Sequence, residues 1–291
     1  MNYEGIIYRP PSEANSLLIQ ATVGCPHNKC TFCSMYKQTR FRIKPVSEII
    51  NDLNQSRDFY GDWVQSIFFP DGNTIIMKTD DLVKIFEHAH SLYPNLKRIT
   101  LYGSARFVNR KSPAELSRLR QAGLTRVHTG MESGDDITLE KIKKGVGSEA
   151  IIAAGLKLKE ASIQISEYYL VGIGGTERTE AHAVNSARVL NSFSPDFIRL
   201  RTYVPMPGTP LYDDYKQGVF NLLSPHQALR ETRLLIENLD CKNSLLLSDH
   251  ISNYCNVNGL LPGDKENMLQ EIDLALQIPE SDFRPPHLSH L

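Results

Sequence analysis

Residues 17–33 read LLIQATVGCPHNKCTFC, a short apolar run followed directly by three cysteines. The run Leu17–Ala21 has the length and composition of a buried strand. Cys25, Cys30 and Cys33 then fall within nine residues, in a polar segment that contains a proline. The stretch therefore predicts a strand whose following loop carries a group of thiols.

Further apolar runs follow the first one along the chain. Strands are predicted at Ser66–Phe69, Arg98–Leu101, Arg126–Thr129, Ile163–Val171 and Phe197–Thr202. Between the strands, apolar residues at helical spacing predict helices over Ser47–Phe59, Asp80–Leu92, Ser112–Ala122, Ala150–Ala161 and Glu177–Asn191. Because a helical crossover joins parallel strands, this alternation predicts an α/β chain with a parallel sheet.

The number of units leaves two architectures open. A complete TIM barrel has eight strand–helix units, and this chain has six. A partial barrel and an open, doubly wound sheet both fit that number. In both architectures, ligands bind beyond the carboxyl ends of the strands, where the cysteine loop is expected to lie.

The alternation stops after Pro210. A helix near Pro225–Leu239, an apolar run at Ser244–Leu247 and a helix near Asp264–Leu276 predict an extension that packs on the same core. From Pro279 onward we expect a frayed tail, whose histidines, His287 and His290, have no expected chemical role.

Composition excludes several classes of protein. Of the 291 residues, 41% are hydrophobic, which is enough to build a sizeable core and excludes wholesale disorder. Lys plus Arg number 32 and Asp plus Glu number 33, so the chain lacks the strong positive charge of a general nucleic-acid binder. No apolar run approaches the roughly 18 residues that span a bilayer. Five cysteines, an odd number, predict no disulfide framework, so we expect a cytoplasmic protein.

The three clustered cysteines indicate a metal centre. A structural zinc ion takes four protein ligands, yet His27 stands only two residues from Cys25 and a second paired-cysteine motif is missing. Three cysteines suit a [4Fe–4S] cluster whose fourth iron stays open to a substrate or cofactor. We favour the iron–sulfur cluster and keep a zinc-stabilised binding module as an alternative.

The cysteine segment resembles that of the radical S-adenosylmethionine (SAM) superfamily. That family has three cysteines after the first strand of a partial (βα)6 barrel, with an aromatic residue before the last cysteine. Phe32 fills the aromatic position, and the first gap between cysteines is one residue longer than usual. The resemblance implies an α/β fold of that type, a partial (βα)6 TIM-like barrel over residues 1–211. A C-terminal helical extension would cover residues 212–278 and a tail residues 279–291.

Later segments resemble further landmarks of the family in the same order. The resemblance implies that Asp71, Gly72 and Asn73 hold the SAM ammonium, and that Glu132 and Ser133 belong to a GxES-like element near the ribose. It places Lys144 on the SAM carboxylate and the turn with Gly172 and Gly174 near the adenosine. The segment Val204–Leu211 matches the P-x-P-G-T-P-L signature of the branch that holds coproporphyrinogen-III-oxidase-like and methylthiotransferase-like cores.

The resemblance also implies an activity. With a [4Fe–4S] cluster and SAM as cofactors, the protein would be an oxygen-sensitive enzyme that abstracts hydrogen from a substrate not identified by its sequence. Electrons would come from a donor such as flavodoxin or ferredoxin. The polar stretch Ser248–Cys255 is expected to close the site, with Tyr254 or Cys255 as a hydrogen-atom donor. We expect a small-molecule substrate, and keep as an alternative a tRNA-modifying enzyme that uses the basic clusters at Arg40–Lys44 and Lys141–Lys144.

Overall fold

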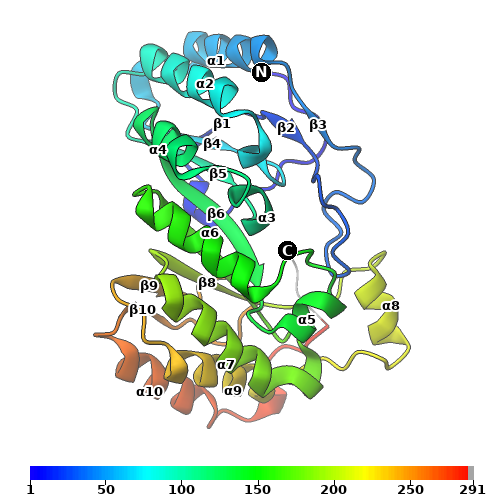
Figure 1. Cartoon of the computed structure of the whole chain (residues 1–291). Coiled ribbons are helices and arrows are strands. Elements are labelled where there is room, and N and C mark those ends of the chain that lie inside the picture. Colours follow the sequence, from blue (N-terminus) through cyan, green and yellow to red (C-terminus); the bar gives the residue numbers. More distant parts are fainter. Residues whose placement is uncertain (288–291) are drawn as a thin grey trace. The chain divides into compact units, whose positions relative to one another are not determined.

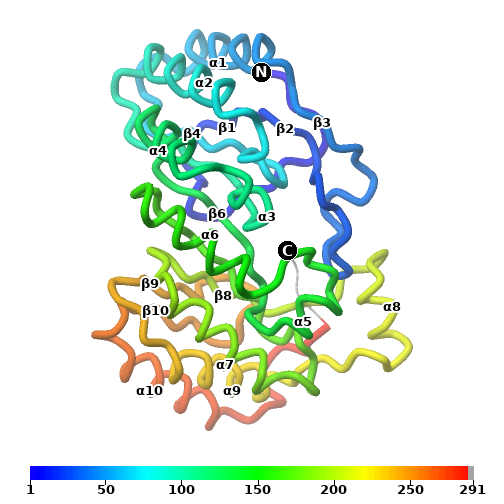
Figure 2. The backbone as a smooth tube through the Cα atoms, viewed as in Figure 1, coloured from blue at the N-terminus to red at the C-terminus, as the bar shows by residue number. Residues whose placement is uncertain are grey.

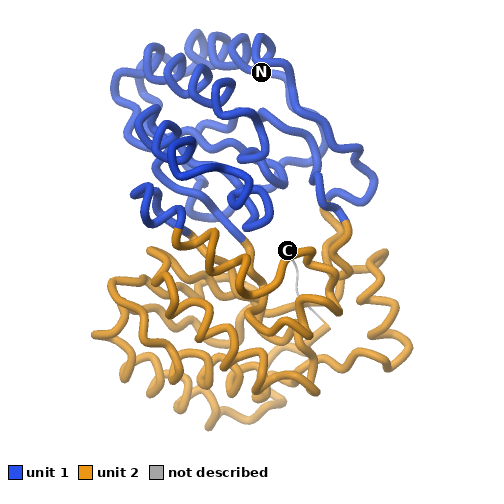
Figure 3. Tube along the Cα trace, in the orientation of Figure 1, with its two compact units in different colours: residues 1–28, 36–129, 157–165 blue, residues 29–35, 130–156, 166–291 orange. Residues whose placement is uncertain are grey.

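The computed structural model describes residues 1–287 of the chain, which form two compact units (Figure 3). The first unit contains residues 1–28, 36–129 and 157–165, and the second contains 29–35, 130–156 and the remainder from 166. The chain thus passes between the units several times. Within residues 1–287, no helix combines the length and the apolar character needed to cross a bilayer.

The main sheet of the described chain has eight strands in the order β1-β4-β5-β6-β7-β8-β9-β10. The strands are β1 (Leu17–Leu18), β4 (Ser66–Phe69), β5 (Arg98–Tyr102), β6 (Leu124–Glu132), β7 (Gln164–Val171), β8 (Phe197–Thr202), β9 (Ser244–Leu247) and β10 (Asn258–Leu261). β1, β4, β5 and β6 pair in parallel, as do β7, β8 and β9, whereas β10 is antiparallel to β9. β6 and β7 each begin in the first unit and end in the second.

The helices follow the strands as crossover connections (Figure 1). They are α1 (Val46–Tyr60), α2 (Thr79–Leu92), α3 (Ala105–Val108), α4 (Pro113–Gln121), α5 (Asp136–Lys141), α6 (Ser148–Glu160), α7 (Gly175–Phe193), α8 (Pro210–Lys216), α9 (Pro225–Asn238) and α10 (Lys265–Ala275). α4 begins as its sequence predicts, because Ser112 and Glu115 form a reciprocal capping box ahead of Pro113. In the second unit, α9 packs against both α7 and α10 (Figure 2).

Each of the six predicted strands and each of the predicted helices is present. Most of their ends differ from the predicted ones by a few residues. Several features lie outside the expectation, including the short helices α3, α5 and α8 and the strand β10. The run Ser244–Leu247 forms β9, which continues the sheet beside β8, so the C-terminal extension adds strands as well as helices. A separate pair of two-residue strands, β2 (Thr22–Val23) and β3 (Arg42–Ile43), encloses the cysteine loop.

The tail is described only as far as residue 287. Residues 280–282 form a short 3-10 helix, and Glu280 accepts a hydrogen bond of 2.7 Å from the backbone N–H of His226 at the start of α9. We expected no chemical role for His290, and this residue lies outside the described part of the chain. The division expected at residue 211 stays a prediction.

The first unit contains a buried ionic network that involves Glu13, in the turn Pro11–Glu13 before β1. The Glu13 carboxylate lies 2.9 Å from Nε2 of His128, 3.1 Å from the Arg98 guanidinium and 2.6 Å from the Ser16 hydroxyl. Burial alone would raise the pKa of Glu13, but these partners outweigh it and lower that pKa to about 2. The network joins the segment before β1 to β5 and β6.

Replacing the carboxylate in Glu13→Ala is expected to cost about 2–4 kcal/mol of unfolding free energy, because it leaves the buried His128 and the Arg98 guanidinium without their partner. The pKa of Glu13 is lower in the folded protein than in the unfolded chain. Its contribution to the unfolding free energy is therefore present above about pH 4.5 and is lost as the pH falls toward 2. Urea unfolding at pH 7 and pH 3 measures both effects, with exposed Glu237→Ala as the control. Equal losses for the two variants at pH 7 would contradict this account.

Candidate functional site

The cysteine loop runs between β2 and β3 and belongs to both units. Cys25 lies in the first unit and Cys30 and Cys33 lie in the second. All three are half-buried, and none forms a disulfide. The Asn28 backbone N–H approaches the Cys25 sulfur at 3.5 Å, and the Asn28 side chain donates to the Tyr36 carbonyl at 2.6 Å, which fixes the first half of the loop.

The turn after β4 lies directly against Cys25. The Gly72 N–H donates to the Gly24 carbonyl at 3.0 Å, and a Cβ added at Gly72 would stand 2.7 Å from the Cys25 Cβ. Only a glycine therefore allows this close approach. The Asn73 amide nitrogen lies 3.9 Å from the Cys25 sulfur, and the Asn73 Oδ1 is buried and accepts no hydrogen bond from residues 1–287. The turn thus offers the Asn73 Oδ1 as a buried acceptor beside a candidate cluster ligand.

Asp71 occupies this turn with φ at +71°, a strained conformation for a residue with a side chain, and is almost fully buried. Its carboxylate accepts a 2.6 Å hydrogen bond from Gln20, and Gln20 in turn exchanges hydrogen bonds with the backbone of Glu4. Burial raises the pKa of Asp71 against the lowering effect of these partners. Gln20 engages one oxygen of the Asp71 carboxylate, Oδ2, whereas Oδ1 is buried and has no hydrogen-bond partner among residues 1–287. The expected contact of Asp71 with the SAM ammonium stays a prediction.

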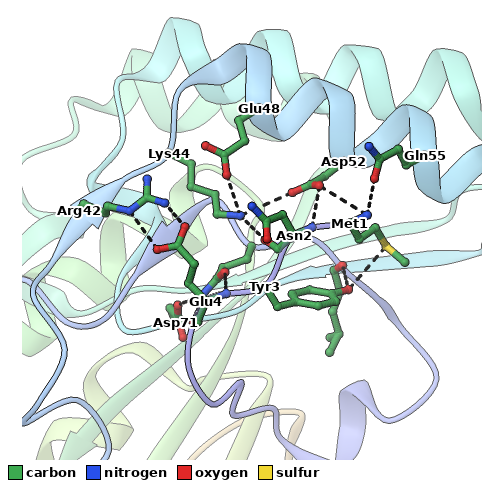
Figure 4. A network of polar contacts seen from close by, with 12 residues as sticks. Met1, Asn2, Tyr3, Glu4, Arg42, Lys44, Glu48, Asp52, Gln55 and Asp71 are labelled. Atoms are coloured by element: carbon green, nitrogen blue, oxygen red, sulfur yellow. Dashed lines mark hydrogen bonds and ion pairs between the residues drawn. The ribbon is translucent and has the colours of Figure 1, made fainter.

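The N-terminal segment is anchored around the same turn (Figure 4). Lys44 is buried, pairs with Glu48 at 3.1 Å and Asp52 at 3.5 Å, and donates to the Asn2 carbonyl. Arg42 pairs with Glu4. These ion pairs neutralise the basic segment around β3.

In the second unit, Lys144 follows α5 and pairs with Glu132 at the end of β6, 3.0 Å away. The Lys144 ammonium also lies 6.0 Å from the centre of the Phe32 ring. Burial opposes the charged form, yet the Glu132 carboxylate, by its charge and by accepting a hydrogen bond, raises the pKa of Lys144, so the ammonium stays charged. Three residues predicted for the SAM site are thus brought together beside Cys30.

Ser133, also predicted for this site, is fully buried and is engaged by the protein itself. Its hydroxyl lies 2.8 Å from Nδ1 of His182 on α7 and accepts a 3.0 Å bond from the Asp135 N–H. Burial lowers the pKa of His182 to about 4, so the ring is neutral near pH 7. Ser133 thus joins the end of β6 to α7.

A hydrogen bond to α9 holds the glycine turn after β7 in place. Gly172 has φ at +80°, and its N–H donates to the Glu231 carboxyl at 2.7 Å. Tyr169 donates to the same oxygen at 2.9 Å and stacks on the His182 ring, with centroids 4.5 Å apart. Gly174 caps the start of α7. Burial raises the pKa of Glu231 to about 8 despite these two donors, and its neighbour at 3.5 Å, Nε2 of His182, belongs to a ring that is neutral near pH 7.

Tyr254 and Cys255 lie beside the end of β8. The backbone N–H of Thr202 donates to the Ser252 hydroxyl at 3.0 Å, which docks their segment onto the strand. The Arg284 guanidinium lies 4.3 Å from the centre of the Tyr254 ring. The cavity that both residues line measures about 10 Å³, the space of one water.

Sequence reasoning missed Gln20, His182 and Glu231. Gln20 lies in the first predicted strand, where a polar side chain among apolar ones was a signal. Glu231 shares a helical face with Ala228, Leu235 and Thr232, and a carboxylate on a buried face was a signal as well. His182 gave none, because its partners are distant in sequence.

The donor set fits an iron–sulfur cluster. Three half-buried thiols stand on one short loop, and the glycine at position 72 lets the turn after β4 lie close against the first of them. Within residues 1–287, no three His, Cys, Asp or Glu side chains gather closely enough to share one metal ion. A cluster sets a different requirement, because each cysteine binds its own iron atom.

Comparison with known proteins places these residues in context. The family model described as the radical SAM superfamily matches residues 19–187, more than half of the chain. The anaerobic magnesium-protoporphyrin IX monomethyl ester cyclase of Cereibacter sphaeroides is 24% identical over 75% of this chain, and the chain spans about a third (35%) of that relative.

Two solved structures have a similar fold. The match with methylornithine synthase (PylB) covers 88% of this chain and 68% of the synthase chain, with a TM-score of 0.55 and 16% sequence identity. The radical SAM methyltransferase TsrM of Kitasatospora setae, solved with cobalamin and a [4Fe-4S] cluster bound, matches 72% of this chain and 41% of its own, with a TM-score of 0.58 and 18% identity.

Adding a single methyl group in Gly72→Ala is expected to displace Cys25, because the new Cβ would overlap the Cys25 Cβ and backbone. After anaerobic reconstitution, the variant should retain less than half of the wild-type iron. Gly263→Ala, where the nearest atom lies 3.7 Å away, is the matched control. Normal iron content in a folded Gly72→Ala protein would show that the turn does not constrain the loop.

Removing the buried acid in Glu231→Gln is expected to flatten the pH dependence of stability. Because its folded pKa lies above the unfolded one, Glu231 stabilises the fold at low pH, and that contribution is lost as pH rises from about 4.5 through 8. The wild type should therefore lose up to about 1.4 kcal/mol per pH unit, relative to the variant, between pH 6.5 and 8. If the unfolding free energies of the wild type and of Glu231→Gln, measured with urea, changed equally with pH across this range, the conclusion that Glu231 is a buried neutral acid would be contradicted.

Proposed function

Because the chain belongs to the radical SAM superfamily, we propose that Cys25, Cys30 and Cys33 hold its [4Fe–4S] cluster, and that it cleaves SAM to abstract hydrogen from a small-molecule substrate. The observation that carries the proposal is the spacing of three cysteines after β1, inside the matched residues 19–187.

Membership of the family confirms the coarser expectations. The protein is an enzyme, its fold class is the partial TIM-like barrel, and the cofactors of the superfamily are a [4Fe–4S] cluster and SAM. The substrate and the residues that contact SAM are proposals of ours.

In this proposal each of the three cysteines would bind one iron of the cluster, and the fourth iron would be left for SAM. When bound and reduced, the cluster supplies the electron that splits SAM into methionine and a 5′-deoxyadenosyl radical. The protein's own task is to bind, orient and shield the reactants.

Several side chains and backbone groups are assigned to SAM. The buried, unpartnered Oδ1 of Asn73 suits the SAM ammonium, as do the backbone carbonyls of its turn. Lys144, which its neighbours keep charged, would hold the carboxylate, while Glu132 orients Lys144 and accepts from the ribose. The turn of Gly172 and Gly174 would present backbone to the adenosine.

The charge pattern favours a small substrate over tRNA. Arg42 pairs with Glu4, Lys44 pairs with Glu48 and Asp52, and Lys144 pairs with Glu132. Lys141 pairs with Glu177 at 3.6 Å. Because most members of the two basic clusters have acidic partners, the positive charge that phosphate contacts require is partly neutralised there. A reductant such as flavodoxin or ferredoxin completes the proposal. Tyr254 and Cys255, expected as hydrogen-atom donors, line their cavity together with Leu229 of α9 and Ile272 of α10, on the helix-covered side of the sheet, so no donor is assigned to them here.

Substituting each loop cysteine by alanine tests the assignment. The wild type, reconstituted under nitrogen, should hold about four irons per chain and form 5′-deoxyadenosine with dithionite and SAM. Cys25→Ala, Cys30→Ala and Cys33→Ala should each lose at least a hundredfold in product formation. Cys241→Ala, a buried thiol outside the matched residues, is the control. SAM cleavage that survives in Cys30→Ala would overturn the ligand set.

A further inference from the structure

Two arginines of β8, Arg199 and Arg201, lie on the same face of the sheet. Successive side chains of a strand alternate between faces, so residues two apart share one. Arg199 donates to the Ser166 hydroxyl on β7 at 3.0 Å, and the Arg201 guanidinium lies 5.2 Å from the centre of the Tyr168 ring. β8 pairs with both β7 and β9, so it is an interior strand of the sheet.

The opposite face of these strands is covered by helices. Tyr169 points to α9 and α7, where it contacts Glu231 and His182, and Ile198 and Leu200 are buried. Because helices coat the outside of a (βα) barrel, the arginines stand on the inner face, and Arg201 lies one residue before the C-terminal end of β8, the end at which such folds bind their ligands.

Neither arginine has an acidic partner. Within residues 1–287, no carboxylate stands at ion-pair distance from Arg199 or Arg201. Three other arginines of the second unit do have one: Arg178 pairs with Asp135, Arg188 with Glu149 and Arg233 with Asp273. Arg199 is only 8% exposed, and a serine hydroxyl does not neutralise its charge. Buried cations without counter-charges are costly, so this face is built for an anion that the chain does not supply.

The segment 248–255 approaches the same arginines. Besides the Ser252 bond, Asn253 accepts a 3.0 Å hydrogen bond from the Thr202 hydroxyl and donates to the Leu200 carbonyl at 2.9 Å. His250 lies near enough that burial and the Arg201 charge, opposed by Asp249, lower its pKa to about 4. His250 thus adds a neutral imidazole to the face and no charge.

We propose that Arg199 and Arg201 form the anion-binding part of the substrate site, and that the substrate is a small organic acid whose carboxylate pairs with Arg201. This rests on the proposed function. Arg201 is the more exposed of the two, and its planar fork matches one carboxylate in a bidentate pair. Arg199 lies deeper, is held by Ser166, and adds its charge from behind.

The test uses the reconstituted enzyme with SAM and three carboxylate probes: acetate, benzoate and glutarate. Glutaramide is the neutral control and inorganic phosphate the competing anion. At least one carboxylate should raise the Tm of the wild type saturably, whereas glutaramide should not. The concentration of that carboxylate that gives half of the full Tm increase should rise at least tenfold in Arg201→Gln. It should stay unchanged in Arg230→Gln, which replaces an exposed arginine on α9. Stabilisation by phosphate alone, or by none of the probes, would overturn the carboxylate assignment.

Ligand-free stability gives a second readout. Because Arg199 and Arg201 lack counter-charges, Arg199→Gln and Arg201→Gln should keep or raise the Tm without probe. A fall of more than about 5 °C in both variants would mark the arginines as structural and overturn the proposal.

SAM measurements separate this proposal from the function on which it rests. If Arg201→Gln binds and cleaves SAM as the wild type does, the lost anion belongs to the substrate. If SAM affinity falls tenfold, the arginine holds the SAM carboxylate and the substrate class is overturned. If the wild type does not cleave SAM at all, the proposed function fails, whatever the carboxylates do.

Discussion

Parallel pairing of strands is the constraint on which the candidate site depends. In a parallel sheet, every strand ends at the same edge, and the loop that follows it must turn there. In the first unit, this places the cysteine loop after β1 beside the turn after β4, where Gly72 lets the backbone touch Cys25. In the second unit, the same rule sets the end of β6 and the glycine turn after β7 on the side from which ligands enter.

Buried polar groups then decide how firmly each turn is held. Gln20 fixes the strained Asp71, Glu231 holds Gly172 from α9, and His182 engages Ser133. Glu231 and the β8 arginines lie beyond residue 187, so the C-terminal part of the chain contributes to the site although the family model stops before it. Arg199 is buried and Arg201 half-buried, both carry a permanent charge, and the described chain supplies neither with an acidic ion-pair partner; that observation carries the inference about the substrate.

Much of the architecture could be predicted from the sequence, because hydrophobic periodicity reports local structure. The six strands and their crossover helices follow from it, as does the capping box at Ser112. The addition of β9 to the sheet could not be read, since a four-residue apolar run does not reveal its partner. The candidate SAM residues follow from resemblance alone, and the internal bond of Ser133 depends on a histidine 49 positions away. Long-range partners of that kind leave no local signal.

The EPR spectrum of the reduced, reconstituted protein, recorded with increasing SAM, tests the central claim most directly. Three cysteine ligands leave one iron open, so SAM should bind that iron and alter the spectrum of a [4Fe–4S]⁺ cluster, in parallel with formation of 5′-deoxyadenosine. Tightly bound zinc, with no cluster signal and no cleavage of SAM, would contradict the account and return the chain to the class of metal-stabilised binding domains.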